Sequence, residues 1–85
     1  MFLHPKAAEY LKRLDSSLRS RIRGRLKELE ESPREKGQRL KYSSFYRLRV
    51  GDYRVIYEVD EERKRVIVLF IGHRRRVYDD FSKVL

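Results

Sequence analysis

The sequence predicts an α+β fold in which an N-terminal helical hairpin packs on one face of an antiparallel sheet of three or four strands. Two observations support this class. Apolar residues recur at helical spacing in the first third of the chain, and they alternate with a period of two after about residue 45. With 85 residues, the chain can bury about 60–65% of its unfolded surface, so we expect one domain over residues 1–85.

The first helix is predicted over residues 5–14, because proline suits the first helical turn and Pro5 begins the pattern. Asp15 and Ser16 supply turn and N-cap chemistry for a second helix, which Pro33 ends. The apolar positions are Ala7, Leu11 and Leu14 in the first helix and Leu18, Ile22, Leu26 and Leu29 in the second. Together the two helices form a hairpin with one apolar face.

The sheet is predicted from three runs rich in β-branched and aromatic residues, at 45–50, 53–59 and 65–71. The first two runs flank a two-residue turn, Gly51-Asp52, which is typical of a β-hairpin. The third run is apolar almost throughout. The tail after Gly72 forms either a short fourth strand or a helical turn, and the pattern alone does not distinguish them.

The predicted hairpin gathers three arginines on one face of the sheet. A two-residue turn pairs Arg49 with Arg54 and leaves Arg47 on the same face, where only Glu58 offsets the charge. A solvated face usually mixes charge signs, so this imbalance favours an anion site over an ordinary outer surface. The opposite face should cover the helices, and it carries Tyr46, Leu48, Val50, Tyr53, Val55, Tyr57 and Val59.

Composition limits the partners and the chemistry. The 22 basic and 13 acidic residues give a net charge of +9, which indicates a polyanionic partner, nucleic acid first and an anionic membrane surface second. No apolar run approaches the ~18 residues of a membrane span and no secretory leader is visible, so we expect a cytoplasmic protein without membrane contact. The absence of cysteine excludes disulfides, and two scattered histidines predict no metal or cofactor.

A second basic cluster, residues 72–81, follows the third predicted strand directly. His73 offers an imidazole for acid–base chemistry, three arginines occupy positions 74–76, and Tyr78 offers a ring that can stack on a base. Taken singly, these are ordinary surface, tail or core residues. Together with the hairpin arginines they predict a cationic groove with one acid–base candidate. Cleavage without a metal points to RNA, whose 2′-hydroxyl is an internal nucleophile.

The segment YRLRVGDYRVIYEVDEE, followed by VIVLFIGHRRRVYDDF, resembles the sheet region of the RelE/ParE toxin superfamily, and most closely its RelE branch. The segments ESPR and QRLK also fit, so the resemblance covers about residues 5–80. It implies a metal-independent toxin that cleaves mRNA in the ribosomal A site. It also implies that an acidic antitoxin, encoded beside the toxin, holds it inactive.

The resemblance implies a role for each of several residues. Arg47 and Arg49 correspond to basic strand residues near the scissile phosphate, and Arg54 to the arginine that holds this phosphate. Arg74 corresponds to the arginine that stabilises or protonates the leaving oxygen, and Tyr78 to the tyrosine that stacks on the nucleotide.

The chain also departs from the pattern of the superfamily. Arg49 stands where a lysine acts as the proposed general base, so His73 or Glu58 takes an acid–base role, or the rate depends on electrostatics and positioning. The N-terminal MFLHP is a stub where the family has a full strand. Further RNA contacts are expected from Arg39, Lys41, Arg75 and Arg76.

Two alternatives remain at this stage. A ParE-type toxin has the same fold but poisons DNA gyrase, and the His73, Arg74 and Tyr78 arrangement argues against it by resemblance. A non-catalytic module that binds RNA or the ribosome would use the same arginines only to hold phosphates.

Overall fold

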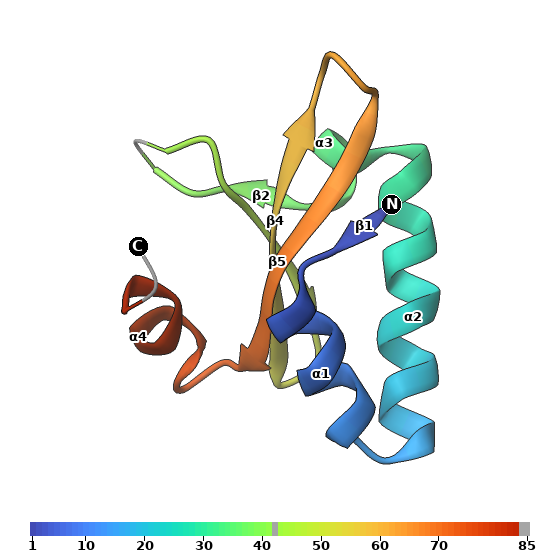
Figure 1. Ribbon diagram of the computed structural model, residues 1–85, viewed down its shortest axis with the longest axis vertical. Helices are drawn as coiled ribbons and strands as arrows, with labels where there is room; N and C mark the ends of the chain where they lie inside the picture. The colour runs from blue at the N-terminus through green and yellow to red at the C-terminus, as the bar shows by residue number, and fades with distance from the viewer. Residues whose placement is uncertain (42, 84–85) are drawn as a thin grey trace.

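The computed structural model describes residues 1–41 and 43–83, which form helices on both sides of one five-stranded sheet (Figure 1). The strand order is β1-β5-β4-β3-β2, with β1 parallel to β5 and the other neighbours antiparallel. The elements are β1 (Phe2–Leu3), α1 (Pro5–Arg13), α2 (Ser16–Glu31), α3 (Pro33–Lys36), β2 (Gln38–Arg39), β3 (Tyr46–Val50), β4 (Tyr53–Asp60), β5 (Arg65–His73) and α4 (Val77–Ser82). The predicted α+β class is confirmed.

The two predicted helices are α1 and α2, and their boundaries follow local capping chemistry. Asp15 is the N-cap of α2, and its side chain accepts a hydrogen bond from the amide of Leu18 at 3.0 Å. Pro33 follows the end of α2 as predicted, but it also opens the short α3, which the sequence pattern did not indicate. In the part of the chain that the structure describes, no helix is long and apolar enough to cross a membrane.

The sheet has two more strands than the three clear sequence patterns predicted. Both are two-residue edge strands, too short to show an alternation. The N-terminal stub forms β1, in which Phe2 lies opposite Ile67 of β5. The amide of His4 extends this contact by donating to the carbonyl of Val68 at 2.8 Å. On the other edge, β2 pairs with β3. Five strands therefore replace the predicted three or four.

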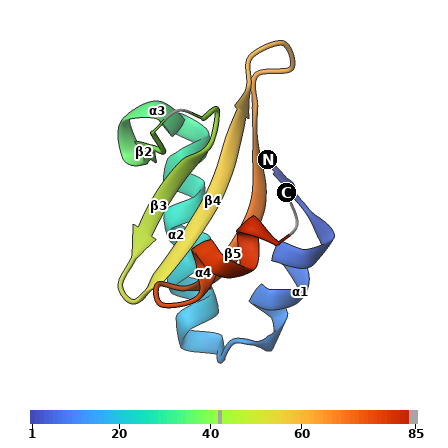
Figure 2. The same ribbon diagram turned by 90° about the vertical axis from the view of Figure 1, so that its left-hand side faces the viewer.

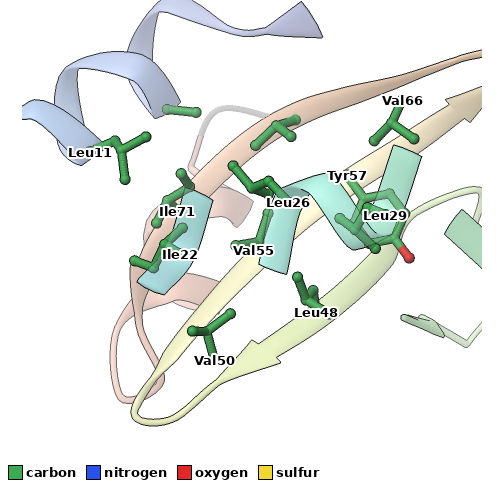
Figure 3. Packing of buried hydrophobic residues seen from close by; sticks show 12 residues of the cluster. Leu11, Ile22, Leu26, Leu29, Leu48, Val50, Val55, Tyr57, Val66 and Ile71 are labelled. Atoms are coloured by element: carbon green, nitrogen blue, oxygen red, sulfur yellow. The ribbon is translucent and has the colours of Figure 1, made fainter. Parts of the chain in front are cut away.

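The main core lies between the helical hairpin and the sheet (Figure 3). Its residues from β3 and β4 are among those predicted from the alternation, and Leu48, Val55 and Tyr57 have no exposed surface. Burying each such side chain stabilises the fold by about 1.5–3 kcal/mol. The buried members of this cluster are Ala7, Leu11, Ile22, Leu26, Leu29, Leu48, Val50, Val55, Tyr57, Val66, Val68 and Ile71.

A second, smaller apolar cluster lies on the other side of the sheet, under α4. Figure 2 shows α4 and α2 on opposite sides of the strands. The register of β5 shifts beside Ile56, so that Ile56 pairs with Phe70 and Tyr57 with Val68, leaving Leu69 as an extra residue. Since β5 is covered on both sides, its sequence is apolar almost throughout. The cluster contains Ile56, Val77 and Phe81, with Phe45, Leu69 and Phe70 packed against them.

Candidate functional site

The β3–β4 hairpin has the predicted register. Arg49 pairs with Arg54 and Arg47 with Ile56, so the three arginines share the face of the sheet that is opposite to α1 and α2. The turn requires a glycine, because Gly51 has a φ of 58°, in the left-handed region that other residues rarely adopt. The predicted gathering of three guanidinium-bearing residues on one face is therefore confirmed as geometry.

One of these arginines connects the hairpin to α4. Nη1 of Arg47 donates a hydrogen bond to the hydroxyl of Tyr78 at 3.2 Å. Nη2 and Nε of Arg47 both donate to Oε1 of Gln38, at 2.7 and 3.2 Å, because Gln38 of β2 lies directly opposite Arg47. Gln38 was not predicted as a site residue, because the short edge strand β2 shows no sequence pattern.

Arg54 and Arg74 lie at the other end of this face, around the hairpin turn. Nη1 of Arg54 donates to the carbonyls of Gly51 and Tyr53 at 2.8 and 2.9 Å. The amide of Arg74 donates to the carbonyl of Asp52 at 2.7 Å, and its Nε is 3.7 Å from Oδ1 of the same residue. The turn after β5 therefore lies beside the β3–β4 turn. The hydrogen bonds of Arg54 use one nitrogen, so its guanidinium keeps N–H groups for an anion.

Arg49 lies between these two groups, with an exposed side chain that forms no hydrogen bond or ion pair with the described residues. Its carbonyl accepts a hydrogen bond from Nη1 of Arg25 at 3.0 Å. Arg49 is thus a cation with unused donors on the outer face. Glu58, which shares this face in β4, accepts a hydrogen bond from the hydroxyl of Ser44 at 3.3 Å.

His73 is not in the predicted groove. It pairs with Tyr53, and their ring centroids are 5.5 Å apart, on the helix side of the sheet. Gly72, not His73, lies opposite Arg54 on the arginine face. The prediction that His73 lies in the same groove as the arginines was wrong, because a sequence pattern does not reveal the register shift in β5. Nearby on α1, burial first and then the neighbouring Tyr53 raise the pKa of Tyr10.

The structure gives His73 a structural contact instead. Its Nδ1 accepts a hydrogen bond from the amide of Arg75 at 3.2 Å, and its carbonyl accepts one from the amide of Arg76 at 2.9 Å. His73 therefore shapes the turn that leads into α4. Gly72 also serves this turn, because a Cβ at Gly72 would lie 3.2 Å from Cβ of Val77.

The four residues expected to make further RNA contacts are all exposed. Arg75 and Arg76 lie in the turn between β5 and α4, beside Arg74. Arg39 pairs with Tyr46, which places it on the helix side of the sheet, and its Nε donates to the carbonyl of Ser43 at 2.9 Å. Lys41 follows β2 in the loop before β3. Arg75 and Arg76 therefore lie near the arginine face, whereas Arg39 does not.

The arrangement can bind and polarise a phosphodiester. Guanidinium groups match phosphate oxygens in geometry and charge, and the exposed ring of Tyr78 can stack on a base. Within residues 1–41 and 43–83, no three histidine or carboxylate side chains lie together as metal ligands would.

Comparisons with known proteins identify the family of this chain. Residues 1–78 match the family model described as the ParE toxin of the parDE type II toxin–antitoxin system. The chain is 32% identical to the mRNA interferase toxin RelE of Escherichia coli strain K12, over 92% of this chain and 87% of the relative.

Two solved structures share the fold. The intact RelBE toxin–antitoxin complex of E. coli superimposes with a TM-score of 0.75 at 29% identity, covering 85% of this chain and 92% of that one. The archaeal RelE–RelB complex of Pyrococcus horikoshii OT3 gives a TM-score of 0.74 at 32% identity, with coverage of 88% and 93%. The match of nearly the whole chain to the family model, together with these relatives, shows that the protein belongs to the RelE/ParE superfamily of type II toxins.

Proposed function

We propose that this protein is an endoribonuclease toxin that cleaves mRNA on the ribosome without a metal ion or another cofactor. Two observations support the proposal. The relative that is 32% identical is an mRNA interferase, and the outer face of the hairpin joins Arg47, Gln38 and Tyr78 in one hydrogen-bonded group. The mRNA is proposed as the substrate and the ribosome as the platform that presents it.

The reaction would use the RNA's own nucleophile. The 2′-oxygen loses its proton and attacks the adjacent phosphorus, and the bond from phosphorus to the 5′-oxygen breaks. The products are a 2′,3′-cyclic phosphate and a 5′-hydroxyl, which takes up a proton. Arg47 and Arg49 would bind the non-bridging oxygens, where negative charge increases in the transition state. The ring of Tyr78 would stack on the nucleotide.

Arg54 would hold the scissile phosphate, as the resemblance implies, and Arg74 would act at the leaving group. An arginine does not release its proton near neutral pH, so Arg74 would stabilise the charge on the 5′-oxygen rather than protonate it. Glu58 shares the outer face and is the remaining candidate for the acid–base role. If Glu58 does not take this role, the rate rests on positioning and electrostatic stabilisation.

The observation that carries the proposal is the hydrogen bond between Arg47 and Tyr78, which joins two segments distant in the sequence. Its test is single-turnover cleavage of mRNA bound to purified ribosomes. Arg47→Ala should lower the rate constant at saturation by about 100-fold, because an oriented donor to the developing charge is lost. Arg63→Ala is the control, since this side chain is 71% exposed and lies on the distant β4–β5 turn. Wild-type protein that leaves ribosome-bound mRNA intact would contradict the proposal.

A second candidate function follows from the family model, whose description names ParE. ParE-type toxins poison DNA gyrase, and the same basic surface would then contact the gyrase complex. A supercoiling assay with purified gyrase separates the two functions. Inhibition of gyrase together with intact mRNA on ribosomes would select this alternative.

We also propose an acidic antitoxin, encoded beside this gene and acting in the cytoplasm, as the protein partner. The relatives in two solved complexes are bound to RelB, and the +9 charge of this chain favours an acidic partner. Such a partner would be partly disordered when free and would order on the basic surface.

A further inference from the structure

The helix α2 carries a second basic surface, on the opposite side of the sheet from Arg47. Its first twelve residues contain five cations and no acid, whereas its acids lie at its C-terminal end. This order is the reverse of what the helix dipole favours, so the stability of α2 does not explain it. The cations are Arg19, Arg21, Arg23, Arg25 and Lys27.

Three of these cations point to solvent. Arg21, Arg23 and Lys27 are exposed, and helical spacing places Arg21 on one side of Gly24 and the other two on the opposite side. A Cβ built on Gly24 would meet no atom within 4 Å. A glycine inside a helix lowers its stability relative to alanine, and no contact within the described residues requires one here. A partner's backbone could approach α2 closely at this point.

The basic surface of α2 is continuous with the arginine face of the sheet. Arg25 reaches across the edge of β3 to the carbonyl of Arg49. Nη2 of Arg21 lies 3.2 Å from the position that a Cβ of Gly51 would take. The carbonyl of the same glycine accepts a hydrogen bond from Arg54. Cations thus extend from α2, around the hairpin turn, to the proposed site of cleavage.

We propose that the α2 basic surface, defined as Arg21, Arg23 and Lys27, binds the phosphate backbone of structured RNA. An RNA backbone fits better than a protein, because protein interfaces are built around buried apolar or aromatic anchors. The exposed large apolar side chains of the described residues are Met1, Phe2 and Tyr78, and none of them is on α2. The inference rests on the proposed function for one point only, that this RNA is ribosomal.

The direct test measures binding of the purified protein to a short fluorescein-labelled RNA duplex at several salt concentrations. Combining Arg21→Gln, Arg23→Gln and Lys27→Gln should weaken binding about tenfold at physiological salt and lower the slope of log K against log salt by about two. Arg25 stays intact, because it holds the β3 edge.

The control combines Arg34→Gln, Arg63→Gln and Lys64→Gln. It also removes three positive charges, but at the other end of the molecule. Its affinity should remain within about twofold of wild type. Equal losses of affinity in the two variants would show that only the net charge matters, and would overturn the proposal. An α2 variant with wild-type affinity and salt slope would also overturn it, and so would a variant that loses only antitoxin binding.

Cleavage assays on ribosomes keep this inference separate from the proposed function. The α2 variant should need about tenfold more ribosomes for half-maximal cleavage, whereas Arg47→Ala should lower the rate at saturation. An unchanged ribosome requirement would contradict the ribosomal assignment. If the wild type cleaves nothing, the proposed function fails, and the duplex measurement still decides whether α2 binds RNA.

Discussion

At the scale of single residues, Tyr57 shows how one phenol organises the end of the sheet. Its side chain has no exposed surface, and its hydroxyl donates a hydrogen bond to the carbonyl of Pro33. A Cβ at Gly37 would overlap this hydroxyl, so the chain passes closely here only because residue 37 is glycine. This contact helps to fix α3 and the start of β2, and β2 in turn places Gln38 opposite Arg47.

The titration of Tyr57 predicts how stability depends on alkaline pH. Burial, with a smaller effect of Tyr46, raises the pKa of Tyr57 from 10.0 to about 12. Because the fold favours the neutral phenol, the contribution of Tyr57 to the free energy of unfolding is complete below about pH 10. This contribution is lost as the pH rises towards 12. We expect the free energy of unfolding in urea to fall by about 1.4 kcal/mol per pH unit in this window.

The variant Tyr57→Phe isolates this effect, since every other titratable group is the same in both proteins. It should cost about 1 kcal/mol at neutral pH, through loss of the hydrogen bond, and should show a shallower decline between pH 10 and 12. Parallel pH profiles for the two proteins would show that Tyr57 does not titrate in this range.

At the scale of secondary-structure elements, α4 depends on one small apolar cluster. A helix of six residues is too short to be stable alone, so its packing decides whether it forms. The ring of Phe81 contacts Phe45 and Phe70, with centroids 5.2 and 6.0 Å away. These contacts hold Tyr78 within reach of Arg47.

Phe81→Ala should therefore detach α4 without unfolding the main core, which consists of other residues. Amide hydrogen exchange should accelerate in α4 and leave the β3–β4 hairpin protected. Cleavage should fall about tenfold, because Tyr78 is no longer positioned. Phe2→Ala is the control, as Phe2 is 46% exposed on the edge strand β1 and lies outside the cluster under α4. Full protection of α4 in Phe81→Ala would show that other contacts hold it.

The same elements show how far sequence reasoning reaches. The hairpin was predicted correctly because its turn and its alternation are local signals, and they place Arg47, Arg49 and Arg54 on one face. His73 was misplaced because the extra residue Leu69 reverses the alternation within β5. Such a shift depends on packing from both sides of the sheet, which a periodic pattern does not report. Gln38 was missed because two paired residues carry no period at all.

At the scale of the whole molecule, charge is separated along the sheet. The Gly51 turn is surrounded by Arg21, Arg54 and Arg74. The opposite end of β4 borders a cavity of about 530 Å³, whose charged lining has more acids than bases. Those acids are Glu30, Glu31, Glu35, Asp60 and Glu61. A polyanion approaching this protein is therefore drawn to the turn end, from which the cations of α2 and of the arginine face extend.

This distribution also predicts that salt stabilises the fold. Arg49 and Arg54 lie directly opposite each other, which is unfavourable, whereas ion pairs such as Arg13–Glu9 are exposed and contribute little. Added salt should therefore weaken the repulsion between the arginines more than it weakens the attraction within the ion pairs. The thermal midpoint should rise by about 4 °C between about 0.05 and 0.5 M sodium chloride, or roughly 0.5–1 kcal/mol.

The α2 variant with three glutamines provides the comparison, because its net charge falls from +9 to +6 when three cations are removed. Its midpoint should be higher than that of the wild type at low salt and should rise less as salt is added. The two curves should converge at about 1 M salt, because the Debye length is then only about 3 Å and is shorter than the spacing of the arginines. A midpoint that decreases with salt would mean that the ion pairs, and not the excess of arginines, dominate the electrostatics of this fold.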